Sequence, residues 1–132
     1  MIDAARAELL SPDTLQVGIN LGNILLVTGK AENGDPEGIA PDMGQALAER
    51  LGVEVQYQTF ATPGEVADAA ERNEIDVGLI ANEPKRAIVI DFCDPYVEIE
   101  ATYLVPAGSS LQTVEDVDAP GVRIAVSERA AY

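Results

Sequence analysis

Side chains that carry catalytic chemistry are scarce in this sequence. It contains no histidine, which excludes Ser–His–Asp and Cys–His catalysis and any histidine-ligated zinc site. Cys93 is the single cysteine, so neither an internal disulfide nor a thiolate cluster can form. We expect Cys93 to be a buried packing residue, because a free cysteine behaves as a small hydrophobe. The sequence has no phosphate loop and no dinucleotide fingerprint, and we expect no metal, nucleotide or redox cofactor.

Arg86 is the residue whose type best suits ligand binding. A planar guanidinium can make two parallel charge-assisted hydrogen bonds to a carboxylate. The alternative is a structural arginine that pairs with a nearby acid, such as Glu83 or Asp91. Glu83 in turn either accepts hydrogen bonds from a cationic ligand or is a solvated loop residue.

The charge balance narrows the range of partners. Eight Lys and Arg residues against 23 Asp and Glu give a formal net charge of −15 over 132 residues. A field of that sign repels phosphate backbones and anionic lipid headgroups, so we expect neither a nucleic-acid nor a membrane-surface partner. The content of 47% hydrophobic and 23% charged residues is typical of a globular domain rather than of a disordered chain.

Strand and helix patterns alternate along the chain and must position these side chains. Residues 3–10 have helix-forming composition, and periodicity predicts strands at 15–20, 53–58, 75–80, 99–105 and 122–126, with a short extended segment at 88–92. The predicted helices are 42–51 and 63–73, followed by a helical turn at 111–116. Strands separated by helices imply a parallel sheet with right-handed crossovers, which is an α/β layered domain.

The helix at 42–51 carries specific expectations about its ends and its buried face. Asp42 is placed to cap its start, and Gly52 suits the left-handed residue that often ends a helix. Helical spacing predicts one apolar face, made of Met43, Ala46, Leu47 and Leu51.

Ligands of parallel sheets lie outside the carboxyl ends of the strands. Asn20 and Asn23 follow the first predicted strand and offer both donors and acceptors, although either side chain can instead satisfy its own turn. Phe60 follows the second strand of the predicted domain and is either an apolar wall of the site or a core residue.

In order and spacing, the chain resembles the extracytoplasmic solute-binding proteins, family 3, of amino-acid-type ABC transporters. The matching stretches are 15–20, 38–48, 73–78, 84–87, 90–96, 104–106, 114–117 and 121–126. The resemblance implies an α/β fold of the type II periplasmic-binding-protein kind, with a parallel-dominated sheet and two lobes that close on a small ligand.

The resemblance also implies a division of the chain. Residues 1–14 are expected to be a helical lead-in, 15–105 the ligand-binding lobe 1, and 106–132 the crossover and the start of an incomplete lobe 2. We therefore expect a truncated member, periplasmic in location, whose leader is absent from this sequence and whose partner is the membrane permease of an ABC transporter. A truncated lobe leaves strand edges unpaired, which favours a possible homodimer.

Within the family pattern, Arg86 matches the arginine that forks onto the ligand carboxylate. Glu83 stands where the family usually has threonine, and Ala81 stands where a hydroxyl residue often lies near the ligand's ammonium group. Arg129 and Ala130 replace a turn, often containing Gly and Ser, that touches the ligand from the second lobe. These departures weaken the expectation of an ordinary α-amino-acid pocket.

Asn20 and Asn23 occupy the tip where the family often has an acidic residue and a stacking aromatic. The ligand-binding residues expected from the sequence are thus Arg86, Asn20, Asn23, Ala81, Glu83 and Phe60, and no catalytic residue is expected.

Three functions remain open at this point. The first is a non-enzymatic receptor that captures a small carboxylate-bearing solute, an amino acid or a related organic acid, for transporter uptake. The second is a dehydratase-like enzyme on the same fold, with Glu83 as a general acid. The third is a half-receptor or sensory module that dimerises. Turnover of the ligand separates the second from the first, and solution mass tests the third.

Overall fold

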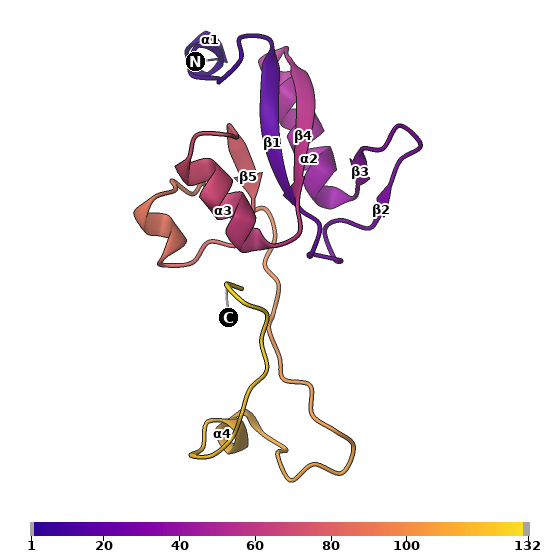
Figure 1. Cartoon of the computed structure of the whole chain (residues 1–132), viewed down its shortest axis with the longest axis vertical. Helices are drawn as coiled ribbons and strands as arrows, with labels where there is room; N and C mark the ends of the chain where they lie inside the picture. The colour runs from indigo at the N-terminus through magenta and orange to yellow at the C-terminus, as the bar shows by residue number, and fades with distance from the viewer. Residues whose placement is uncertain (1, 131–132) are drawn as a thin grey trace.

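A three-stranded parallel sheet lies in the upper part of the molecule in Figure 1, and the computed structural model describes residues 2–130. The strands are β1 (Thr14–Asn20), β4 (Glu54–Phe60) and β5 (Val77–Leu79), in the order β4-β1-β5. The central strand β1 pairs with β4 along its whole length and with β5 at its carboxyl-terminal half. The predicted α/β class with a parallel sheet is confirmed, and so are the strand positions of β1, β4 and the shorter β5.

Two helices cover opposite faces of this sheet. Helix α2 (Ile39–Leu51) connects β1 to β4, and α3 (Pro63–Glu71) connects β4 to β5. The main core lies on the α2 face, where Leu15, Val17 and Ile19 are at most 1% exposed. A second, smaller core lies on the α3 face. Alternate residues of β1 therefore serve two cores, as the period of a strand requires.

Glycines let α3 approach the sheet closely. A Cβ on Gly18 would lie 2.6 Å from Ile75 Cδ1, and a Cβ on Gly78 would lie 2.9 Å from Val66 Cγ1. The two glycines are register partners on β1 and β5. Together they form a flat patch on which the fully buried Val66 of α3 sits.

Helix α2 buries a different face from the one predicted. Met43, Ala46 and Leu47 are exposed, whereas the buried positions are Ala40, Pro41, Gly44 and Ala48. Of the predicted face only Leu51 packs on the main core. The reason is steric, since a Cβ on Gly44 would lie 2.9 Å from Val17 Cγ1. At so short an approach only small side chains fit against the sheet, and the larger ones point outward.

The ends of α2 also differ in part from expectation. The helix begins at Ile39 after Gly38, and no side chain caps it, so the predicted capping role of Asp42 is wrong. Asp42 lies in the first turn, where a carboxylate still favours the positive end of the helix dipole. Gly52 ends the helix in the left-handed conformation with φ 72°, as predicted.

Short elements surround the sheet. Helix α1 (Ile2–Arg6) is shorter than the predicted 3–10, and β2 (Gly29–Lys30) pairs antiparallel with β3 (Pro36–Glu37). A single 3₁₀ turn, η1 (Arg86–Ile88), replaces the start of the segment 88–92 that was predicted to be extended.

The last third of the chain contains little regular structure. Residues 91–126, here called the arm, run away from the sheet, pass through α4 (Val114–Val117) and return toward it (Figure 1). The helical turn predicted at 111–116 corresponds to α4, but the strands predicted at 99–105 and 122–126 are wrong, because neither segment forms a β-ladder. Leu104 is 99% exposed, so the apolar pattern of this segment finds no partner within the described residues.

Candidate functional site

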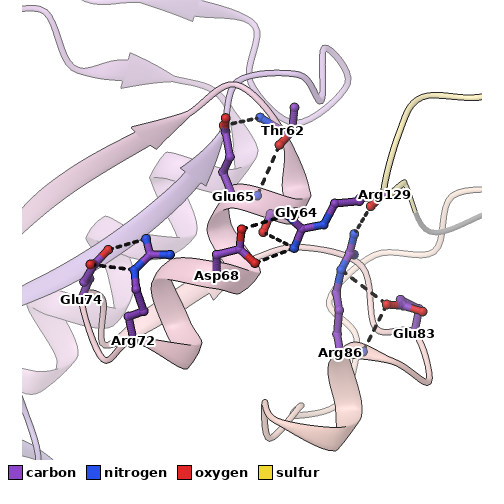
Figure 2. A network of polar contacts seen from close by, with 9 residues as sticks. All are labelled: Thr62, Gly64, Glu65, Asp68, Arg72, Glu74, Glu83, Arg86 and Arg129. Atoms are coloured by element: carbon purple, nitrogen blue, oxygen red, sulfur yellow. Dashed lines mark hydrogen bonds and ion pairs between the residues drawn. The ribbon is translucent and has the colours of Figure 1, made fainter.

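A pocket of about 510 Å³ lies between α3, the loop that follows β5, and the end of the described chain. Helix α3 begins three residues after β4, and the loop at 80–85 follows β5, so the pocket lies near the carboxyl ends of two strands. Its size falls in the range of small-molecule sites. Three charged side chains define its geometry: Asp68, Arg86 and Arg129 (Figure 2).

Arg86 forms the buried side of the pocket. It is 5% exposed, and its guanidinium donates one hydrogen bond to the carbonyl of Ala81 and one to the carbonyl of Arg129, each at 2.9 Å. Burial lowers the pKa of the Arg86 side chain, and the neighbouring Glu83 carboxylate opposes this shift. A guanidinium has five N–H donors, so these two bonds leave further donors for an additional acceptor.

Glu83 holds the loop on which Arg86 sits. Its two carboxylate oxygens accept the backbone N–H groups of Lys85 at 3.2 Å and Arg86 at 3.1 Å. Glu83 Oε1 also lies 3.7 Å from Arg86 Nε, which forms an ion pair at the start of η1. The structure thus contains the acid–arginine contact expected as the structural alternative for Arg86, and it involves Glu83.

Asp68 and Arg129 close the opposite side of the pocket. The Arg129 guanidinium donates to both carboxylate oxygens of Asp68, with Nη1 at 2.8 Å from Oδ2, and to the carbonyl of Gly64 at 3.1 Å. The hydrogen bonds from Arg129 lower the pKa of Asp68, and its positive charge adds to that effect. Both side chains remain partly exposed, at 52% for Arg129 and 36% for Asp68.

The start of α3 explains why Gly64 and Asp68 share one side of the pocket. Thr62 Oγ1 accepts the backbone N–H of Glu65, and the Glu65 side chain accepts the backbone N–H of Thr62, which is a complete capping box. This cap fixes the first turn, and Gly64 and Asp68 follow at i and i+4 on one helix face. At the far end of α3, Arg72 pairs with Glu74 outside the pocket.

Of the predicted ligand-binding residues, only Arg86 and Glu83 line this pocket. Asn20 Oδ1 accepts the backbone N–H of Gly22 at 3.0 Å, and Asn23 Oδ1 accepts that of Leu25 at 3.2 Å. Each asparagine side chain therefore accepts a backbone hydrogen bond within its own turn. The apolar run at 24–27 belongs to the turn that begins at Asn23. A ligand role for Asn20 and Asn23 stays a prediction.

The remaining predicted residues have structural surroundings. Ala81 contributes its carbonyl to Arg86, and Phe60 packs on the small core beneath α3. Ligand roles for Ala81 and Phe60 likewise stay predictions. Cys93 is exposed, so the expectation of a buried packing residue is wrong. The physical reason is its place in the arm, which has no core to receive the side chain.

Asp68 and Gly64, which both bind Arg129, are among the pocket residues that the sequence did not reveal. Asp68 lies 61 residues from Arg129 in the chain, and no local pattern signals such a contact. The helical spacing of Gly64 and Asp68 is the one available signal, because it places a carboxylate one turn from a position without a side chain. Arg129 was noted as a departure from the family turn, but its contact with lobe residues was not foreseen.

Comparison with known families settles the general identity. Residues 15–126 match the bacterial extracellular solute-binding proteins, family 3. The chain belongs to this family. The resemblance inferred from the ordered stretches is therefore confirmed, and with it the type II periplasmic-binding-protein fold that neighbouring structures share.

Relatives within the family illustrate what similar chains do. The amino-acid-binding protein AabA of Dichelobacter nodosus is 22% identical over 80% of this chain. This chain spans only 42% of the length of that relative. Amino-acid binding is what the name of that relative states for the relative itself.

Two solved structures are similar as well. An ancestral cyclohexadienyl dehydratase is 26% identical, with a TM-score of 0.59, over 70% of this chain and 38% of its own. A variant of domain 1 from TmArgBP, described as its arginine-bound form, is 25% identical with a TM-score of 0.58. That match covers 74% of this chain and 72% of the TmArgBP domain.

Two further properties concern residues 2–130 as a whole. Across this described part of the chain, no three metal-ligating side chains come together. Among the same residues, no helix has the length and apolar character needed to cross a bilayer.

Proposed function

We propose that the chain binds a small carboxylate-bearing solute, an amino acid or a related organic acid, in the pocket between α3 and η1. The observation that carries the proposal is the buried Arg86 guanidinium, which forms one side of a cavity of about 510 Å³. A carboxylate that replaces the carbonyl of Arg129 adds its own negative charge to a bond in which only the Arg86 donor is charged at present.

The rest of the proposal follows from family membership. Solute-binding proteins of this family support an extracytoplasmic location and delivery of the solute to the permease of an ABC transporter. In this proposal residues 15–105 are lobe 1 and 106–132 belong to the crossover and the start of a second lobe. The arginine-bound form described for domain 1 of TmArgBP supports the idea that one lobe alone retains a solute.

Ligand screening tests the proposal directly. Amino acids and simple carboxylic acids are added one at a time while the melting temperature is recorded, since binding to the folded state raises it. Arg86→Lys keeps the charge but loses the planar fork, and we expect it to weaken binding about tenfold or more. Arg72→Lys changes an exposed arginine outside the pocket and should leave the shift intact.

A folded Arg86→Lys chain with undiminished carboxylate binding would contradict the proposed role of Arg86. Circular dichroism of both variants shows whether the fold is retained. The absence of any stabilising carboxylate in the unchanged protein would contradict the proposal as a whole.

The dehydratase neighbour favours a second candidate, an enzyme acting on cyclic carboxylates. Glu83 would be its acid, yet both Glu83 oxygens accept backbone N–H bonds, which suits a positioning role better than proton donation. Incubation with a hydroxylated cyclohexadienyl carboxylate, followed by proton NMR, decides between the two. A receptor returns the compound unchanged, whereas a dehydratase releases water and a new ring signal develops.

The third candidate, a half-receptor or sensory module that dimerises, is tested by solution mass. Sedimentation equilibrium that yields twice the monomer mass of 13.9 kDa would favour it. A monomer over the whole concentration range would exclude it.

A further inference from the structure

Arg129 places two of its own functional groups in the pocket. Its main-chain carbonyl accepts a hydrogen bond from Arg86 at 2.9 Å, and its guanidinium binds Asp68 and the carbonyl of Gly64 (Figure 2). A free arginine molecule carries the same two groups, a carboxyl oxygen and a guanidinium, on the same skeleton. The pocket thus already holds an arginine residue by both of its ends.

The surface beneath the guanidinium is shaped for it. A Cβ on Gly64 would lie 2.8 Å from Arg129 Nε and 2.9 Å from Cζ, so the planar group rests where any other residue would project a side chain. Glycine is a poorer helix former than alanine, and at this position its missing side chain makes room for a flat cation.

The backbone of Arg129 shows that its contacts hold it in place. Its φ angle is 57°, in the left-handed region that arginine rarely adopts. Such a conformation persists where the surroundings impose it. Release of Arg129 from its partners would let the backbone relax, which favours exchange with an outside ligand.

The charges of the pocket also favour a cationic ligand. Three carboxylates and three cationic side chains line it: Asp68, Glu71, Glu83, Lys85, Arg86 and Arg129. If Arg129 leaves, the carboxylates are in excess by one. The vacated pocket therefore selects a solute with a net positive charge.

We infer that Arg129 is a built-in competitor that occupies a guanidinium subsite formed by Asp68 and Gly64. This inference rests on the proposed function, because Arg86 would hold the carboxylate of the same solute. The ligand class is a guanidinium-bearing amino acid. Such a solute displaces Arg129 because its carboxylate is charged, whereas the Arg129 carbonyl is neutral, and because the Asp68–Arg129 pair is partly exposed and therefore accessible to a competing cation.

Calorimetric titration with two probes tests the inference. L-Arginine and L-citrulline have nearly the same shape, but only arginine carries the cationic guanidinium. We expect Arg129→Ala to bind arginine about tenfold more tightly than the unchanged chain, because the competitor is gone. We also expect it to prefer arginine over citrulline by about tenfold or more, through the charge of Asp68.

Removal of the carboxylate completes the test. In the double variant Asp68→Asn with Arg129→Ala, arginine and citrulline should bind with equal affinity. Arg72→Ala, at the far end of the same helix, is the matched control and should change either affinity far less than the loss of the Asp68 carboxylate does. Asp68 and Arg129 are partly exposed, so the variants are expected to fold, and thermal melting checks this.

The outcomes distinguish this inference from the proposed function. Equal binding of arginine and citrulline to Arg129→Ala, or arginine affinity no higher than in the unchanged chain, would overturn the inference. Arg86-dependent binding of other carboxylates would in that case leave the proposed function standing. Absence of binding to any carboxylate in every variant would overturn both.

Discussion

Residues 14–90, which contain the sheet with α2, α3 and η1 and are called the lobe below, have apolar patterns similar to those of the arm (91–126) but a different structure. In the lobe, Leu15 and Ile19 alternate with polar or small residues and are at most 1% exposed in the central strand. In the arm, Leu104 and Ile124 lie in comparable runs, yet they are 99% and 51% exposed and form no ladder. An alternating pattern becomes a strand only where a neighbouring strand and a covering helix receive it.

The pocket lies where these two regions meet. Its lobe side consists of α3 and η1, and its other side is the segment that follows the arm, through Arg129. The lobe side is fixed by burial and a capping box, whereas Arg129 is held by polar contacts alone among the interactions described above. One side of the pocket is thus held firmly, and the other side, Arg129, can be replaced. A ligand that displaces Arg129 requires this arrangement.

Truncation of one leucine in each region gives the largest expected contrast. Leu15→Ala removes a side chain that is 1% exposed in the main core and should lower the free energy of unfolding by about 2–5 kcal/mol. Leu104→Ala removes one that is 99% exposed and should change it by less than about 0.5 kcal/mol. Urea denaturation followed by far-ultraviolet circular dichroism measures both. A large loss from Leu104→Ala would mean that the arm packs on a surface in solution.

The same capping box occurs in both regions and sharpens the comparison. Thr62 caps α3 in the lobe, and Thr113 caps the four-residue α4 in the arm with the same pair of reciprocal hydrogen bonds. Thr62→Ala should cost about 1 kcal/mol of global stability, because α3 is part of the cooperative core. Thr113→Ala should leave global stability unchanged and alter only local amide exchange in α4, since the arm can open by itself.

Urea denaturation and amide hydrogen exchange, applied to both threonine variants, separate these two effects. Equal losses of global stability would show that the arm unfolds together with the lobe. That result would break the distinction between the two regions.

The lone cysteine allows a smaller chemical test. Cys93 lies in the arm and is exposed, so its thiol should react with a disulfide reagent without denaturant. The expected stoichiometry is one thiol per chain, reached at the same final value with and without urea. Protection of Cys93 until the protein unfolds would indicate that the arm is covered in solution.

The contrast also explains how much of the fold the sequence could predict. Strands β1 and β4 and helix α3 were predictable because their periodicity and the start at Thr62 are local features. The buried face of α2 was not, because the close approach of Gly44 to Val17 is a tertiary fact that reverses the usual preference for large apolar side chains. The strands expected in the arm failed for lack of a partner.

The site divides in the same way. Arg86 and Glu83 are three residues apart, so their contact could be anticipated from the sequence. The pairing of Asp68 with Arg129 spans 61 residues and depends on the path of the arm, for which the sequence carries no local signal. Contacts between residues close together in the sequence could thus be predicted, whereas a contact that depends on the path of the whole chain could not.

Acidification gives the last and most local test, since it acts on the contact that joins the two regions. Arg129 lowers the pKa of Asp68 chiefly by hydrogen bonding, and Arg72 contributes a weaker electrostatic effect in the same direction. A carboxyl with a lowered pKa in the folded state stabilises that state above its unfolded pKa, and the contribution is lost as the pH falls through the folded value. The Asp68–Arg129 contact should therefore be complete at neutral pH and disappear only in strong acid.

Nuclear magnetic resonance titration of the Asp68 carboxyl carbon measures this directly. In Arg129→Ala the pKa of Asp68 should rise toward the ordinary aspartate value, and in Arg72→Ala it should rise less, because the largest cause remains. Gly64→Ala should raise the pKa of Asp68 less than Arg129→Ala, since the added Cβ would crowd the guanidinium without removing it. An Asp68 pKa at its ordinary value in the unchanged protein would mean that the segment after the arm does not rest on α3 in solution, and the pocket would then have a single wall.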